Sequence, residues 1–90
     1  MLRVITKRKG TTHQFELHGM LSGPWVSLLE DHWRSIVEGY PSGNVEVVLC
    51  NVEFIDPDGE RLIARMARAG VKFVVSGCMN RYVVEKLQTQ

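Results

Sequence analysis

Residues 45–59 read VEVVLCNVEFIDPDG, and this stretch determines how the rest of the chain is arranged. Its first half is apolar except for Glu46, which is typical of a central strand that is covered on both faces in a parallel sheet. Its end is an acidic turn in which Asp56 predicts a helix N-cap and Pro57 a first helical residue. We therefore expect a buried strand that leads, through a short bridge, into a capped helix.

The segments on either side alternate between strand and helix patterns. The predicted strands cover residues 2–7, 12–18, 45–50 and 71–76, and residues 51–55 form the bridge. The predicted helices cover residues 24–39, 57–69 and 82–87. The order β-β-α-β-α-β-α predicts an α/β fold, a four-stranded mixed sheet that is parallel after its first hairpin and has helices packed on it. The 90 residues are enough for one domain, which we expect to span residues 1–90.

Both long helices are predicted to be amphipathic. The apolar face of the first should contain Trp25, Leu28, Leu29, His32, Trp33, Ile36, Val37 and Tyr40. The second should turn Leu62, Ile63, Met66 and Ala67 inward and Arg61, Arg65 and Arg68 outward. Loops 19–24, 51–59 and 77–80 should meet beyond the carboxyl ends of the strands, where open α/β sheets bind ligands.

The composition narrows the class of protein. A net charge of +1 argues against a general nucleic-acid binder, and no apolar run is long enough to span a membrane. The N-terminus turns basic after a short apolar patch and lacks a signal-peptide pattern, so a cytoplasmic location is expected. Cys50 and Cys78 fit that compartment as free thiols.

The acidic turn is the clearest candidate for chemistry. Asp56, Asp58 and Glu60 could bind a metal or accept a phosphoryl group, but helix capping is the favoured interpretation because one local cluster does not supply convergent oxygens from several loops. Like that cluster, the arginine row Arg61, Arg65, Arg68 has two interpretations, a solvated face or a surface that meets a partner.

The histidines and cysteines give weaker signals. His13, His18 and His32 are scattered, and His32 is interpreted as part of the apolar helix face rather than a ligand. Two cysteines without a close third ligand support zinc poorly, so both are interpreted as small buried hydrophobic residues. With no nucleotide-binding or nucleophile motif, the sequence favours a binding module over an enzyme and predicts no catalytic residue, metal site or cofactor.

Residues 47–59, VVLCNVEFIDPDG, resemble the signature of the STAS domain, the family named for sulphate transporters and anti-sigma factor antagonists. That signature is an apolar strand, a bridge, "Phe-Ile-Asp", a serine pair, and then Gly and an apolar helix. The early turn LHGMLSG at 17–23, the segment GVKFVV at 70–75 and the final Leu87 also match, so the resemblance covers about residues 12–87. It implies the STAS fold and a role in protein–protein interaction.

Two departures from the family bear on function. Pro57 and Asp58 stand where sigma-regulating members carry the serine pair that a kinase phosphorylates, so this chain is not switched there by serine phosphorylation. Asp58 carries one negative charge where phosphoserine carries nearly two, and is either a partial mimic of that state or a residue that favours the helix start. The chain also lacks the further strand and helix of typical members.

The resemblance implies a non-enzymatic module that docks a bacterial anti-sigma factor or switch-kinase-like protein in transcription regulation and signalling. The predicted partner-binding residues are Asp56, Pro57, Asp58, Gly59, Arg61, Leu62 and Arg65, with Asp58 and Gly59 as the contact tip. One alternative is a STAS-like subunit or scaffold of a lipid-transport ATPase or a stress-signalling complex. Another is a small phosphoacceptor or enzyme that uses Asp56 or Asp58. The sequence also leaves a homodimer open.

Overall fold

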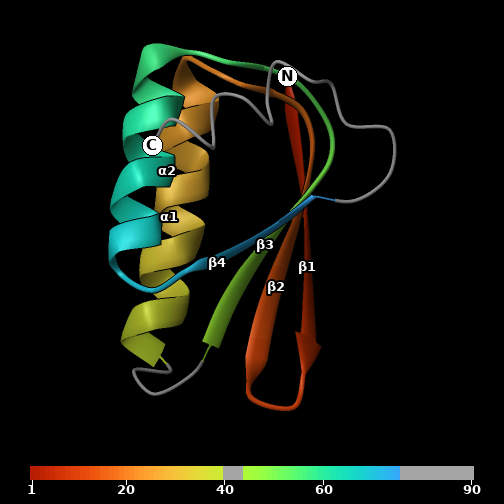
Figure 1. The fold of residues 1–90 in the computed structure, drawn as a ribbon, viewed down its shortest axis with the longest axis vertical. Coiled ribbons are helices and arrows are strands. Elements are labelled where there is room, and N and C mark those ends of the chain that lie inside the picture. Colours follow the sequence, from red (N-terminus) through yellow and green to blue (C-terminus); the bar gives the residue numbers. More distant parts are fainter. Residues whose placement is uncertain (40–43, 76–90) are drawn as a thin grey trace.

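The computed structural model describes residues 1–39 and 44–75, and these form a sheet with two helices on one of its faces (Figure 1). The strands are β1 (Leu2–Lys9), β2 (Thr12–Leu21), β3 (Asn44–Ile55) and β4 (Lys72–Val75). The helices are α1 (Pro24–Gly39) and α2 (Pro57–Arg68). Neither described helix is long and apolar enough to cross a membrane.

The sheet has the predicted topology. Its strand order is β1-β2-β3-β4, with β1 and β2 antiparallel and the other two pairs parallel. The order β-β-α-β-α-β is thus confirmed, and the predicted last helix at 82–87 lies outside the described residues. Parallel pairing follows from the helices, because each crossover returns the chain to the same end of the sheet.

The two central strands are longer than the sequence predicts. β3 continues to Ile55, so the bridge at 51–55 is wrong, and β2 continues past residue 18 to Leu21. The register between them shifts twice, between Leu17 and His18 and between Gly19 and Met20. Each shift interrupts the two-residue alternation that identifies a strand, which explains why these ends do not look like strand in the sequence.

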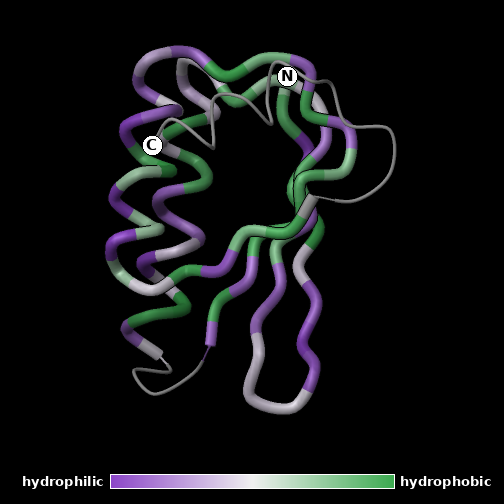
Figure 2. Tube along the Cα trace, viewed as in Figure 1, coloured by the Kyte–Doolittle hydropathy of each residue, from purple (hydrophilic) through white to green (hydrophobic). Residues whose placement is uncertain are grey.

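The core lies between the helices and one sheet face. Phe15 and Leu17 of β2, Leu49 of β3, Leu29 of α1 and Leu62 of α2 are at most 1% exposed and belong to one cluster. Hydrophobic and hydrophilic residues alternate within each turn of α2, as amphipathic packing requires (Figure 2). The chain therefore folds around β3, as its sequence predicts.

The buried stripe of each helix is narrower than predicted. In α1 the buried residues are Val26 and Leu29, while Leu28, His32 and Val37 are exposed. In α2 Ala67 is exposed, contrary to prediction, whereas Met66 is fully buried. The reason is geometric: a helix lying on one sheet face covers only the residues that point at the sheet or at the neighbouring helix.

Candidate functional site

Asp56 fixes the acidic turn to the rest of the molecule. Its carboxylate accepts a hydrogen bond from the Gly59 amide at 2.7 Å, which caps α2, and another from the Gly23 amide at 2.9 Å. Its own amide donates to the Leu21 carbonyl at 3.1 Å. The amides of Gly23 and then Gly59 hold the pKa of Asp56 below its ordinary value. The capping interpretation is confirmed, and loops 19–24 and 51–59 meet as predicted; loop 77–80 lies outside the described residues.

Gly59 is buried and not the tip of the turn. A Cβ on this residue would lie 2.7 Å from the Leu21 carbonyl oxygen and 2.9 Å from a methyl carbon of Ile55. Only glycine therefore permits the close approach of α2 to the end of β2. The prediction that Gly59 forms a contact tip is wrong, because the backbone of β2 covers it.

Leu62 is also placed inward. It is fully buried in the core cluster, so it supports α2 and offers no side chain to a partner. The predicted site residues that remain accessible are Pro57, Asp58, Arg61 and Arg65, which we call the α2 ridge. Asp56 and Gly59 hold that ridge in place without being part of its surface.

Charges of both signs follow one another along the α2 ridge. Arg61 forms an ion pair with Asp58 three residues earlier, and Arg65 donates to Glu30 of α1 at 3.0 Å. Arg34 also lies 3.0 Å from Glu30, and hydrogen bonding from Arg65 is the main cause of a lowered pKa at Glu30. The arginine row faces outward as predicted, and Arg65 additionally connects the two helices.

A hollow of about 360 Å³ lies beside the α2 ridge. Its lining includes Gly23, Ser27 and Glu30 on one side and Asp58, Arg61 and Arg65 on the other. The hollow extends from the turn at Asp56 to the surface between α1 and α2. Charged side chains of both signs line it, so it can accept a polar group.

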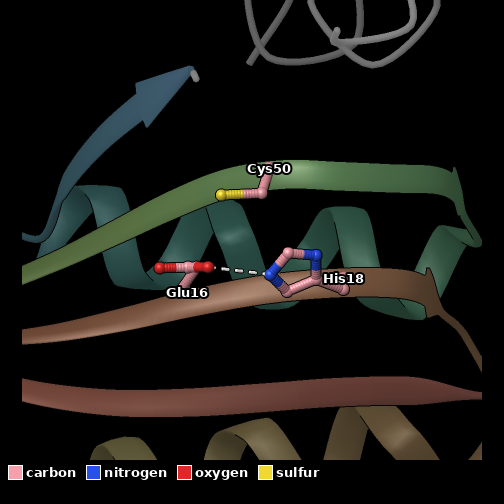
Figure 3. A group of neighbouring side chains, drawn as sticks. All are labelled: Glu16, His18 and Cys50. Carbon is pink, nitrogen blue, oxygen red and sulfur yellow. Dashed lines mark hydrogen bonds and ion pairs between the residues drawn. The ribbon is translucent and has the colours of Figure 1, made fainter. Parts of the chain in front are cut away.

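A second group of polar side chains lies on the sheet face away from the helices. One donor atom each of Glu16, His18 and Cys50 lies within 4.8 Å of the other two (Figure 3). The sequence does not predict this group: its histidines are scattered along the chain, and Cys50, predicted to be buried, is partly exposed. The alternation of β2 places Glu16 and His18 on one face, but only the register with β3 brings Cys50 beside them.

The chemistry open to the acidic turn is limited by its hydrogen bonds. Both oxygens of Asp56 accept from backbone amides, and Asp58 is paired with Arg61. Within residues 1–39 and 44–75, three side chains with metal-ligand atoms close together lie on the sheet face described above. None of the three belongs to this turn. Both carboxylates of the turn are therefore already engaged by groups of the protein itself.

The chain matches no protein-family profile and no curated protein. Two crystal structures of Mglu, one of them of its native form, are similar to it. The first is 26% identical with a TM-score of 0.62, over 80% of this chain and 19% of the Mglu chain. The second is 21% identical with a TM-score of 0.59, over 82% of this chain and 23% of the other. The chain thus spans about a fifth of Mglu, and the likeness concerns the fold.

Proposed function

We propose that this chain is a STAS-like, non-enzymatic interaction module that docks a regulatory protein through the α2 ridge. The observation that carries the proposal is the double hydrogen bond of Asp56, which ties Gly23 to the start of α2. It holds Pro57 and Asp58 exposed at a defined place, supported by the close packing of Gly59. A surface ordered before binding loses little conformational entropy when it docks.

The charge pattern of the α2 ridge favours a partner that offers both signs of charge. Asp58 and Arg61 are each about two-thirds exposed, so a partner can reach both. Because Arg61 compensates the charge of Asp58, the turn presents an ion pair in place of the bare negative charge of a phosphoserine. The recognition we propose therefore depends on the pair and proceeds without a kinase.

The partner class follows from the resemblance to anti-sigma factor antagonists. Residues 54–56 keep the "Phe-Ile-Asp" of that family, and α2 begins at Pro57, directly after it. We accordingly propose an anti-sigma factor or a switch-kinase-like protein as the partner. Such a partner would contact the first turns of α2, while the packing of Leu62 in the core holds that helix in place.

Affinity purification from the native host, followed by mass spectrometry, tests the proposal. The wild-type chain is compared with Asp58→Lys, Asp58→Ser and the matched control Asp31→Lys, which reverses an exposed carboxylate in the middle of α1. We expect a regulator of the stated class to be recovered with wild type and Asp31→Lys and lost with Asp58→Lys. Recovery of no such regulator, or its retention by Asp58→Lys, contradicts the proposal.

The serine variant tests the meaning of position 58. If Asp58 stands in for a phosphoserine, Asp58→Ser should restore a switch, with phosphorylation by the host and a partner that depends on it. If the Asp58–Arg61 pair is the recognised feature, Asp58→Ser should weaken recovery of the partner without any phosphorylation. We expect the second outcome, because Arg61 is already paired with Asp58.

A second candidate function is a constitutive subunit or scaffold of a lipid-transport ATPase or a stress-signalling complex. Two observations favour it: Pro57 and Asp58 replace the switchable serine pair, and in Mglu the same fold occupies about a fifth of a longer chain. Co-purification with a transporter ATPase, insensitive to the Asp58→Ser change, would support this role over regulation of a sigma factor.

A further inference from the structure

Three side chains of different chemistry converge on the sheet face away from the helices. Glu16 and His18 come from β2 and Cys50 from β3, so a carboxylate, an imidazole and a thiol point toward one another (Figure 3). The side chains of Glu16 and His18 are 20% and 27% exposed, and Cys50 is also partly exposed. The group is therefore partly shielded by the sheet and still open to an ion from solvent.

A strand irregularity brings Cys50 into this group. Leu17 pairs with Leu49, but His18 pairs with Asn51, so Cys50 is the extra residue at the register shift. An extra residue bends the strand and redirects its side chain, and such irregularities often occur beside functional sites. Here the shift places the thiol next to the carboxylate and the imidazole of the neighbouring strand.

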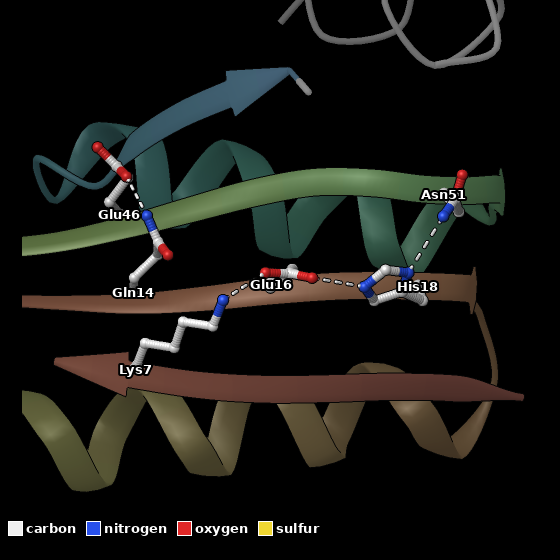
Figure 4. Close-up of polar contacts among 6 residues, drawn as sticks. All are labelled: Lys7, Gln14, Glu16, His18, Glu46 and Asn51. Atoms are coloured by element: carbon white, nitrogen blue, oxygen red, sulfur yellow. Dashed lines mark hydrogen bonds and ion pairs between the residues drawn. The ribbon is translucent and has the colours of Figure 1, made fainter. Parts of the chain in front are cut away.

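Neighbouring groups orient the imidazole and the carboxylate (Figure 4). His18 Nε2 lies 2.9 Å from Glu16 Oε1, and the Asn51 side-chain amide lies 3.3 Å from His18 Nδ1. Hydrogen bonding to His18 and then to Lys7 holds the pKa of Glu16 below its ordinary value. A histidine ligand of a metal is usually fixed through its other ring nitrogen, which is the position that Asn51 occupies.

The donor set indicates the kind of ion. A thiolate favours zinc or copper(I) over magnesium and calcium, and an imidazole suits the same transition metals. Bonds of about 2.0–2.3 Å from a tetrahedral zinc place its donors about 3.3–3.7 Å apart. Donors that already lie within 4.8 Å of one another need only small side-chain movements to reach this spacing.

We propose that Glu16, His18 and Cys50 form a site for a zinc-class divalent metal ion, with one coordination position left for water. This site lies on the opposite face of the sheet from the core and is independent of the docking function of the α2 ridge. Three protein ligands and an open position are typical of zinc sites that exchange a ligand, whereas structural zinc sites are closed by four.

Binding changes the local hydrogen bonds in a defined way. Nε2 of His18 must give up its contact with Glu16 to coordinate the ion, and its proton then resides on Nδ1. Asn51 can turn its amide so that the oxygen accepts from Nδ1. The Cys50 thiol loses a proton, and Lys7, which is 52% exposed and 3.3 Å from Glu16, can swing into solvent.

Zinc titration of the tag-free chain by isothermal calorimetry tests the proposal, because a histidine tag would itself bind the ion. We expect one zinc ion per chain, with affinity reduced at least about tenfold by each of Glu16→Gln, His18→Gln and Cys50→Ser. Matched controls are Glu46→Gln on the same sheet face and His32→Gln on α1, which should bind as wild type does. Circular dichroism of each variant separates loss of ligand from loss of fold.

Cobalt(II) provides a second, spectroscopic readout. A thiolate bound to cobalt gives a charge-transfer absorption in the near ultraviolet, which we expect in wild type and Glu46→Gln and not in Cys50→Ser. The absence of saturable zinc binding, or equal effects of the ligand and control variants, overturns the proposal. In that case the group is a polar network in which Lys7, Glu16 and His18 satisfy one another.

Discussion

Asp56 is the residue on which the geometry of the candidate docking surface depends. Replacing it with Ala removes the acceptors for the amides of Gly23 and Gly59, and we expect Asp56→Ala to lower the free energy of unfolding by about 1–2 kcal/mol near neutral pH. Urea denaturation measures this difference. Asp31→Ala, which removes an exposed carboxylate from α1, should stay within about 0.5 kcal/mol of wild type.

The difference in unfolding free energy between wild type and Asp56→Ala should depend on pH in a defined direction. Because the folded pKa of Asp56 is lowered, its charged form stabilises the fold above the unfolded pKa of about 3.9, and this contribution is lost as the pH falls through the folded pKa. The gap between wild type and Asp56→Ala should therefore shrink in acid. The free energy of unfolding of Asp56→Asn, which keeps an acceptor but carries no charge, should depend less on pH than that of wild type. A gap that stays constant down to the acid-unfolding range would contradict the account.

A second prediction concerns Gly59, which packs against the end of β2. The added methyl of Gly59→Ala meets the Leu21 backbone and a methyl of Ile55, so we expect a loss of about 1–3 kcal/mol despite the better helix propensity of Ala. Gly39→Ala is the matched control, because a Cβ there meets nothing within 4 Å. Thermal or urea unfolding should rank Gly39→Ala at or above wild type and Gly59→Ala below it.

Helix α2 has one face that packs on the core and another that is exposed. Leu62 is fully buried, so Leu62→Ala should cost about 2–5 kcal/mol, whereas Leu28→Ala, at a residue 38% exposed on α1, should cost less than about 1 kcal/mol. Urea unfolding of both variants checks this ranking. Similar losses for the two would mean that the buried stripe of one helix is assigned incorrectly.

The sequence predicts which elements form, but it does not predict all of their buried faces or all of their ends. The N-cap at Asp56 and the first helical residue Pro57 are local signals, and the structure confirms them. The exposure of Leu28 and the burial of Val26 depend on how α1 sits on the sheet, which no local pattern specifies. The sequence does not predict the extension of β3 to Ile55, because the register shifts break its alternation.

The whole molecule brings together residues that the sequence keeps far apart. The contact between Asp56 and Gly23 follows from the rule that loops gather at the carboxyl ends of parallel strands, so this part of the candidate site could be predicted. The burial of Leu62 could also be predicted, from the apolar period of α2. The burial of Gly59 could not, since it depends on the approach of α2 to β2. The convergence of Cys50 on Glu16 and His18 required the exact pairing of β2 with β3.

If the α2 ridge is the surface that meets a partner, the partner should protect the backbone of α2 from exchange with solvent. Hydrogen exchange of the full chain, measured with and without the regulator that affinity purification recovers, tests it most directly. We predict slower amide exchange at residues 58–65 in the complex and no change in the β1–β2 hairpin, which lies at the other end of the sheet (Figure 1). Protection confined to the hairpin, with unchanged exchange in α2, would contradict the account.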